Sequence, residues 1–125
     1  MNSLGRASED YLEAVLILEK QSGHVRSIDV AHYLGVSKAS VSTAMKALQK
    51  VGYITKRTVT HLELTEIGRK IAEQIYERHC FFTERLIAVG VEPSRAEADA
   101  CKIEHVISAE SFQILKDYYS AKVEG

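Results

Sequence analysis

The sequence Cys101-x-x-Glu104-His105 brings a thiol, a carboxyl and an imidazole group to positions i, i+3 and i+4. On a helix these three side chains would share one face. Thiolate, carboxylate and imidazole are all ligands of divalent transition metals. A protein core also rarely holds a cysteine next to two polar side chains. The spacing therefore predicts part of a metal site.

Further candidate ligands lie on two other segments. Asp10 and Glu13 are three residues apart, which would put both carboxylates on one face of a helix. His79 lies on a second segment, within a long predicted helix, and is also a candidate ligand. The next residue, Cys80, is rotated from His79 by about 100° around that helix, so we expect Cys80 to be buried and not to be a ligand. Carboxylate pairs and single histidines are also common on solvated surfaces, so spacing alone does not join these residues into one site. The other histidines fall in turns or in a basic segment, where no ligand partners are evident: His24, His32 and His61.

Positive charge is concentrated in the first half of the chain, although the net charge of the 125 residues is only −1. Between Val30 and Leu62 there are five cationic side chains and no carboxylate, whereas from Glu63 to the end there are 12 Asp and Glu against 8 Lys and Arg. A module that binds phosphates needs only local positive charge. The distribution indicates a nucleic-acid-binding module followed by an acidic one.

Two short helices with a tight turn between them are predicted within the basic segment. Ser27 can cap a helix over 28–34, and Gly35 can end it because glycine adopts a positive φ freely. Ser37 can cap the next helix, 38–51. The apolar face of that helix would carry Val41, Met45, Leu48 and the last residue, Val51. Two helices joined by a Gly-Val-Ser turn form the helix-turn-helix pattern.

A β-hairpin is predicted directly after this pair. In segments 53–55 and 61–64, apolar and polar residues alternate, which is typical of strands. The loop 56–60 between them is polar and cationic. The hairpin makes the pattern a winged helix-turn-helix. Helices are also predicted over 7–21 with Ser8 as N-cap, 65–89, 94–107 with a capping box from Ser94 to Glu97, and 109–122.

The predicted fold is therefore mainly α. A winged helix-turn-helix DNA-binding domain with a two-stranded wing spans 1–70, and a helical domain spans 71–125. The second helix of the pair would enter the major groove with its N-terminal residues leading. Few aromatic residues occur in the basic segment, which favours duplex contacts over base stacking. The predicted DNA-binding residues are Ser37, Lys38, Ala39, Ser40, Ser42, Thr43 and Lys46, with Lys56 and Arg57 on the wing.

Five motifs spread over nearly the whole chain resemble those of one family. They are Ser-Glu-Asp-Tyr-Leu-Glu (8–13), Val-Ser-Lys-Ala-Ser-Val-Ser (36–42), Leu-Thr-Glu-Ile-Gly-Arg (64–69), Glu-Arg-His (77–79) and Ala-Cys-Lys-Ile-Glu-His-Val-Ile-Ser (100–108). The last motif is the most specific. Together they resemble the iron- and manganese-dependent transcriptional repressors of the diphtheria toxin repressor and manganese transport regulator type.

The resemblance implies a metal-dependent DNA-binding repressor of metal homeostasis genes, without enzymatic activity. It implies a homodimer built from the C-terminal helices and ordered by metal for a palindromic, double-stranded operator. It also implies the short form without an SH3-like third domain. The implied cofactor is Mn²⁺ or Fe²⁺, with Zn²⁺ or Co²⁺ able to bind in vitro. The implied metal ligands are Asp10, Glu13, His79, Cys101, Glu104 and His105.

Asp10 and Cys101 depart from both subtypes of this family. The manganese type has acidic residues at both positions and the iron type has methionine and cysteine, so this chain combines one of each. Thiolate is softer than carboxylate and favours iron, cobalt or zinc over manganese. Thr83 stands where the iron type has a carboxylate of an ancillary site, so we do not expect that second site, while a paired-metal arrangement stays open.

Three other classes of function are alternatives to a metal-dependent repressor. A winged-helix regulator that senses a small organic ligand or a redox signal through Cys101 is the main alternative. A metalloenzyme is disfavoured because six ligands leave little open coordination, and a protein-interaction winged helix because residues 30–62 contain no acid. No apolar run approaches the roughly 20 residues of a membrane span, and residues 1–10 lack the apolar core of a signal peptide. We expect a cytoplasmic protein without membrane contact, whose two cysteines form no disulfide framework.

Overall fold

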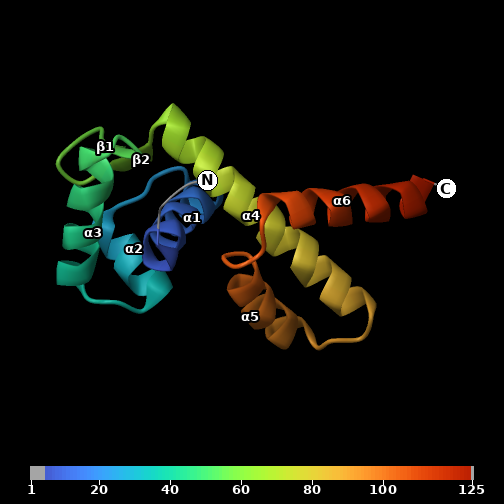
Figure 1. Cartoon of the computed structure of the whole chain (residues 1–125). Coiled ribbons are helices and arrows are strands. Elements are labelled where there is room, and N and C mark those ends of the chain that lie inside the picture. The colour runs from blue at the N-terminus through green and yellow to red at the C-terminus, as the bar shows by residue number, and fades with distance from the viewer. Residues whose placement is uncertain (1–4, 125) are drawn as a thin grey trace. The chain divides into compact units, whose positions relative to one another are not determined.

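The computed structural model describes residues 5–124 of a chain that divides into two units, Met1–Tyr76 and Glu77–Gly125. Residues 1–4 and 125, the outer ends of the two predicted domains, lie outside the described part. Among residues 5–124, no helix has the length and apolar composition that a membrane span requires. The elements along the chain are α1 (Arg6–Ser22), α2 (Ser27–Leu34), α3 (Lys38–Lys50), β1 (Ile54–Lys56), β2 (Leu62–Leu64), α4 (Glu66–Ala88), α5 (Pro93–Ile103) and α6 (Ala109–Glu124) (Figure 1).

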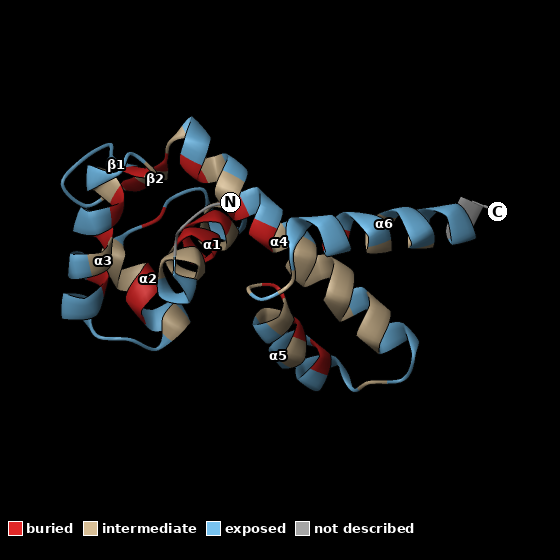
Figure 2. Ribbon diagram, viewed as in Figure 1, coloured by how far each residue is buried: buried red, intermediate tan, exposed pale blue. Residues whose placement is uncertain are grey.

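The first unit has an apolar core between α1, α2 and α3 (Figure 2). α1 contributes Leu12 and Leu16, and α3 contributes Val41 and Met45, all with 0–1% exposure. Each pair is four residues apart, so on each helix the two side chains lie on one apolar stripe. Burial of each such side chain stabilises the fold by roughly 1.5–3 kcal/mol. This core therefore fixes which face of α3 remains exposed to solvent.

The turn between α2 and α3 has the predicted conformation. Gly35 follows α2 with φ 68°, in the left-handed region that only glycine adopts without steric cost. Ser37 caps α3, because its Oγ accepts a hydrogen bond from the backbone N–H of Ser40 at 3.0 Å. Both caps are confirmed. The helix ends one residue early, however, and Val51 is its C-cap, 57% exposed instead of lying on the apolar face.

The wing is a two-stranded antiparallel sheet, as predicted. Ile54 pairs with Leu64 and Lys56 pairs with Leu62, so both strands lie within one residue of their expected positions. The Leu62 N–H also donates to the carbonyl of Val25 at 2.8 Å, which ties β2 to the segment before α2. With this wing, the mainly helical fold class is confirmed.

Two helix starts in the first unit differ from the prediction. Gly5, and not Ser8, is the N-cap of α1. The N-cap of α2 is Arg26 and not Ser27, because the Oδ2 of Asp29 accepts a hydrogen bond from the Arg26 N–H at 2.9 Å and extends the helix by one residue. Each helix therefore begins slightly earlier than its serine suggested.

The second unit is held together by aromatic side chains. Phe81 of α4 lies edge-on to Phe112 of α6, with ring centroids 5.3 Å apart, and 5.8 Å from Tyr119. Such edge-to-face pairs stabilise by about 0.5–1.5 kcal/mol beyond the area they bury. α5 contributes Ala96 and Ala100, both fully buried. These contacts hold α6 against α4.

α5 starts earlier than predicted. Its N-cap is Glu92 and not Ser94, since the Glu92 carboxylate accepts hydrogen bonds from the Arg95 N–H at 3.2 Å and from the Ser94 hydroxyl at 2.6 Å. Pro93 then occupies the first helical position, where a missing N–H costs nothing. A carboxylate two residues upstream has therefore replaced the expected serine cap.

α5 also ends earlier, at Ile103, with Glu104 as its C-cap, so His105 lies in the turn that follows the helix. The helix predicted to carry the whole Cys-x-x-Glu-His motif therefore stops before the motif ends, although ligand atoms of Cys101 and His105 still lie within 4.8 Å of each other. The physical reason is the next helix: Ser108 caps α6 by accepting from the Ser111 N–H at 3.0 Å, and a capping residue has non-helical backbone. The chain must leave the helix before that residue.

Candidate metal centre and nucleic-acid interface

His79 on α4 and Glu104, directly after α5, form a pair within the second unit. Nδ1 of His79 lies 2.9 Å from Oε1 of Glu104, whose residue is only 1% exposed. This hydrogen bond raises the pKa of His79, because the carboxylate stabilises the imidazolium, and burial opposes the effect more weakly. A carboxylate so far out of water requires a positively charged partner.

The second carboxylate oxygen of Glu104 shows whether the residues here could bind a metal ion. Oε2 is buried and has no hydrogen-bond partner among the side chains that the structure describes. An unsatisfied buried oxygen of a charged group costs free energy, and direct bonding to a cation would remove that cost. The residues at this position therefore fit a divalent metal.

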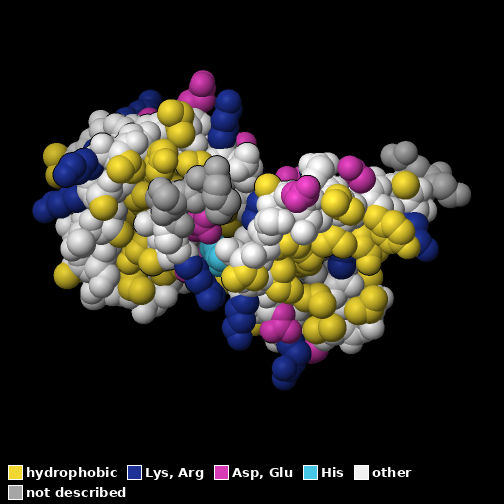
Figure 3. Space-filling model, in the orientation of Figure 1, with side chains coloured by type: hydrophobic (Ala, Val, Ile, Leu, Met, Phe, Trp, Pro, Cys, Tyr) yellow, Lys and Arg dark blue, Asp and Glu magenta, His cyan; other side chains and the backbone are white. Residues whose placement is uncertain are grey.

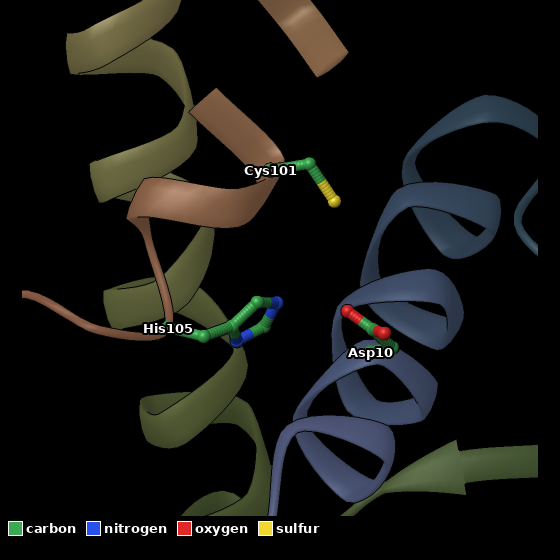
Figure 4. A group of neighbouring side chains, drawn as sticks. All are labelled: Asp10, Cys101 and His105. Carbon is green, nitrogen blue, oxygen red and sulfur yellow. The ribbon is translucent and has the colours of Figure 1, made fainter. Parts of the chain in front are cut away.

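Cys101 on α5 and His105 in the turn after it form a second pair. Both are half-buried, and the Sγ of Cys101 lies within 4.8 Å of a ring nitrogen of His105. Figure 4 shows the two side chains extending to the same side of the α5 end. Thiolate and imidazole suit transition metals better than they suit magnesium or calcium. The turn has thus brought these two ligands together although only Cys101 is helical.

Asp10 and Glu13 belong to the first unit, on α1. Asp10 is half-buried and labelled in Figure 4, and Glu13 is only 7% exposed. Glu13 stands between buried Leu12 and Ala14, so α1 carries a carboxylate where its neighbours are apolar. Carboxylates are not kept at such depth without a compensating charge or hydrogen bond. Their part in a metal site stays a prediction.

Cys80 and Thr83, both on α4 near His79, also carry expectations from the sequence. Cys80 is half-buried, so the expectation of a buried residue is wrong in degree. Thr83 lies four residues after His79, on the same helical face, with a buried hydroxyl that has no hydrogen-bond partner among the described residues. Thr83 therefore offers a hydroxyl and not a carboxylate at this position, and the expectation that no ancillary site forms here stays a prediction.

The predicted DNA-binding residues lie on the exposed surface of α3 and the wing. Figure 3 shows basic side chains on this side of the first unit. Ser37 is partly engaged, because it caps α3 and also donates to the Ser40 hydroxyl at 3.0 Å. Arg57 lies 3.7 Å from Glu63 across the wing, a contact that leaves it 67% exposed. All nine are exposed: Ser37, Lys38, Ala39, Ser40, Ser42, Thr43, Lys46, Lys56 and Arg57.

Two features were missed by sequence reasoning. The rings of His24 and His61 lie edge-on with centroids 5.1 Å apart, a ring contact that the sequence did not indicate, and the groups of metal-ligating side chains found among the described residues include neither. Arg78 donates to backbone carbonyls of the turn that holds Glu104. Its position beside His79 was the one signal that could have pointed to it.

Comparison with known proteins places this chain in a family. A model described as "Iron dependent repressor, N-terminal DNA binding domain" matches residues 3–62, and "Iron dependent repressor, metal binding and dimerisation domain" matches residues 65–121. The transcriptional regulator MntR of Escherichia coli O6:H1 is 33% identical over 117 residues, which are 91% of this chain and 76% of that protein.

Solved structures show the same fold. The IdeR structure of T. acidophilum superposes with a TM-score of 0.79 at 22% identity over 96% of this chain and 56% of that one. A manganese-dependent transcriptional repressor in complex with manganese gives 0.79 at 21% identity over 89% of this chain and 51% of that one. The chain thus spans about half the length of these two solved proteins.

The two matched domains carry the functional assignment. One binds double-stranded DNA, and the other binds a divalent metal cofactor and forms the homodimer. Neither domain is enzymatic, and a sensor of an organic ligand or of redox state is not favoured. This protein belongs to the iron dependent repressor family of metal-responsive, DNA-binding transcriptional repressors.

Proposed function

We propose that this chain binds operator DNA when a site built from Asp10, Glu13, His79, Cys101, Glu104 and His105 holds a divalent metal. The observation that carries the proposal is the buried carboxylate of Glu104. One of its oxygens bonds His79, and the other has no partner among the described residues. Cys101 and His105 add a thiolate and a second imidazole, and the α1 carboxylates would complete the donor set.

The donor set bears on which metal is bound. Among the similar proteins is a manganese-dependent repressor solved with manganese. A thiolate from Cys101 favours iron, cobalt or zinc, whereas the carboxylates of Asp10 and Glu13 are ligands that manganese accepts well. We propose Mn²⁺ or Fe²⁺ as the cognate cofactor, with Zn²⁺ and Co²⁺ binding in vitro.

The coupling to DNA runs through α1. Asp10 and Glu13 are on the same helix as the core residues Leu12 and Leu16, and α2 and α3 pack against that helix. Holding α1 by its carboxylates would therefore also hold the helix-turn-helix. A bound cation supplies the positive charge that lets several carboxylates share one site. Metal and DNA then strengthen each other's binding by one shared factor.

The homodimer would present two copies of α3 to one operator. Half-sites of a palindrome must then lie one helical turn, about 34 Å, or a multiple of it apart. The small and cationic residues at the start of α3 would contact base edges and phosphates, and the wing would contact the backbone or the minor groove. The regulated genes would serve manganese or iron homeostasis. Such a protein acts where the chromosome is, in the cytoplasm, with the DNA-binding part within residues 1–70.

The experiment is a DNA titration with and without metal. Operator fragments are first selected from random duplex DNA by the metal-loaded protein. Wild-type protein should bind them more tightly in Mn(II), or in Fe(II) without oxygen, than in chelator. Glu104→Gln keeps the side-chain shape, so it should fold and keep the affinity measured in chelator while losing the gain from metal. Equal wild-type affinity in both conditions would overturn the proposal.

A further inference from the structure

Arg78, the residue before His79 on α4, bonds to the backbone of the turn after α5. We name residues 104–107 the ligand turn. The Nη1 of Arg78 donates to the carbonyl of Ile107 at 2.9 Å and to that of Glu104 at 3.3 Å. Its guanidinium carbon lies 5.5 Å from the ring centroid of Phe112, within the range of a cation–π contact. All these residues belong to the second unit.

A guanidinium suits this place for two physical reasons. The last carbonyls of a helix have no intrahelical donor, and the C-terminal end carries a partial negative charge. α5 ends at Ile103, so the ligand turn begins where both conditions hold. Arginine stays charged throughout the physiological range, and its donors are fixed in one plane. Arg78 therefore acts as a side-chain cap that keeps the turn in one conformation.

Arg78 and His79 hold the ligand turn through different atoms. His79 bonds the Glu104 carboxylate, a group that a metal would also use. Arg78 bonds only carbonyl oxygens, which are not among the predicted ligands. Its hydrogen bonds are therefore compatible with both an empty and a filled site, whereas the His79 bond competes with metal for Glu104.

From this geometry we propose that Arg78 is a positioning residue for the metal site. It holds the ligand turn so that Glu104 and His105 are already placed before a cation binds. The inference rests on the proposed function, because it concerns the same ligands. It predicts that loss of Arg78 weakens metal binding although no ligand has been removed.

Arg85 offers a matched control on the same helix. Its guanidinium also lies over aromatic rings, 5.3 Å from Phe81 and 5.5 Å from Tyr119, and it pairs with Glu84 at 3.6 Å. Replacing Arg85 by methionine removes an equal charge and similar ring contacts from the second unit. It does so without touching the ligand turn.

The test titrates Co(II) into the full-length wild type, Arg78→Met, Arg78→Gln, Arg85→Met and Glu104→Gln proteins. The d–d bands and the thiolate-to-cobalt band of Cys101 are recorded, affinity is taken from competition with a chelator, and unfolding is measured without metal. Arg78→Met should lose roughly 10- to 100-fold in Co(II) affinity, the range for residues that orient metal ligands. Arg85→Met should keep the wild-type affinity and bands. Arg78→Gln, too short to reach both carbonyls, should fall between them.

The outcomes separate the two hypotheses. If Arg78→Met binds Co(II) as tightly as Arg85→Met, the inference about Arg78 is overturned. Should Arg78→Met fail to fold, Arg78→Gln decides, and wild-type affinity in that variant overturns the inference equally. Wild-type affinity and bands in Glu104→Gln would instead remove the ligand set on which the proposed function depends.

Discussion

The choice of metal is decided at the scale of single side chains, and Cys101 is the residue where this chain has an unusual donor. Its Sγ lies within 4.8 Å of a His105 ring nitrogen, so the thiolate and the imidazole can reach a common ion. The remaining predicted ligands include the carboxylates of Asp10, Glu13 and Glu104. Because a thiolate binds softer metals more strongly, one sulfur among oxygens should change the ranking of metals without removing the site.

The substitution Cys101→Asp tests this ranking. It gives a shell of oxygen and nitrogen ligands, so the ratio of Mn(II) affinity to Co(II) affinity should rise roughly tenfold, which corresponds to about 1.4 kcal/mol. Competitive titration with a chelator measures the ratio, and the thiolate-to-cobalt band should disappear. Cys80→Ala is the matched control, since Cys80 is a half-buried cysteine of α4 that is not a predicted ligand. An unchanged ratio in Cys101→Asp would show that sulfur does not set the preference.

Ligand types could be predicted from the sequence because their chemistry resides in the side chain itself. The pairing of His79 with Glu104 could not, because it depends on α4 and the turn after α5 lying side by side. The contact of Arg78 with the turn after α5 was even harder to predict from the sequence. Arginines are common on helices, and a hydrogen bond to a backbone carbonyl leaves no pattern in the sequence of its partner. Residue type could therefore suggest candidate ligands, and the groups that position His79 and Glu104 could be found only from the fold.

At the scale of elements, the residue at which a helix begins depends on which nearby side-chain oxygen accepts the hydrogen bonds of the free backbone N–H groups. Ser37 caps α3 as expected, because no carboxylate lies near it in the sequence. The serines before α2 and α5 are displaced by carboxylates, Asp29 and Glu92, which accept backbone N–H donors more strongly. A pattern of serines therefore predicts that a helix begins but not the residue at which it begins. At the end of α5 the chain instead follows the serine, because Ser108 caps α6 and Glu104 becomes the C-cap of α5.

Asp29 makes this competition measurable. Its pKa is lowered, first by the hydrogen bond from the Arg26 backbone N–H and then by the Arg26 side chain. A lowered pKa in the folded state means that the carboxylate stabilises the fold above the ordinary pKa of aspartate, about 4, and that this contribution is lost as the pH falls through the lowered value. Asp29→Ala should therefore reduce the free energy of unfolding by about 1 kcal/mol at pH 7.

Chemical denaturation of both proteins between pH 7 and pH 3 checks the sign. The difference between wild type and Asp29→Ala should shrink as the pH falls below about 4, because the wild type then loses its charged acceptor. Asp29→Asn is the control: it keeps an acceptor oxygen but cannot titrate, so its difference from Asp29→Ala should stay constant. A gap between wild type and Asp29→Ala that is independent of pH would contradict the assignment.

For the whole molecule, the distribution of charge matters more than its sum. The net charge is −1, yet the segment from Val30 to Leu62 contains five cationic residues and no acid. This uneven distribution could be predicted from composition because it needs no knowledge of packing. Which of those residues are exposed could not be predicted in this way, and in the fold the start of α3 and the wing are exposed to solvent. Each protomer of the homodimer would offer the same basic surface, so every phosphate contact is made twice.

The salt dependence of operator binding tests that doubling. Lys46→Ala removes an exposed lysine of α3, and the slope of log affinity against log salt should fall by about 0.9 for each lost phosphate contact, or about 1.8 for a dimer. Affinity should fall alike for operator and unrelated DNA, since phosphates carry no sequence information. Lys70→Ala is the matched control, because Lys70 is an exposed lysine of α4 outside the predicted surface. A slope loss of about 0.9 would indicate that one protomer binds alone, and an unchanged slope would place Lys46 away from the DNA.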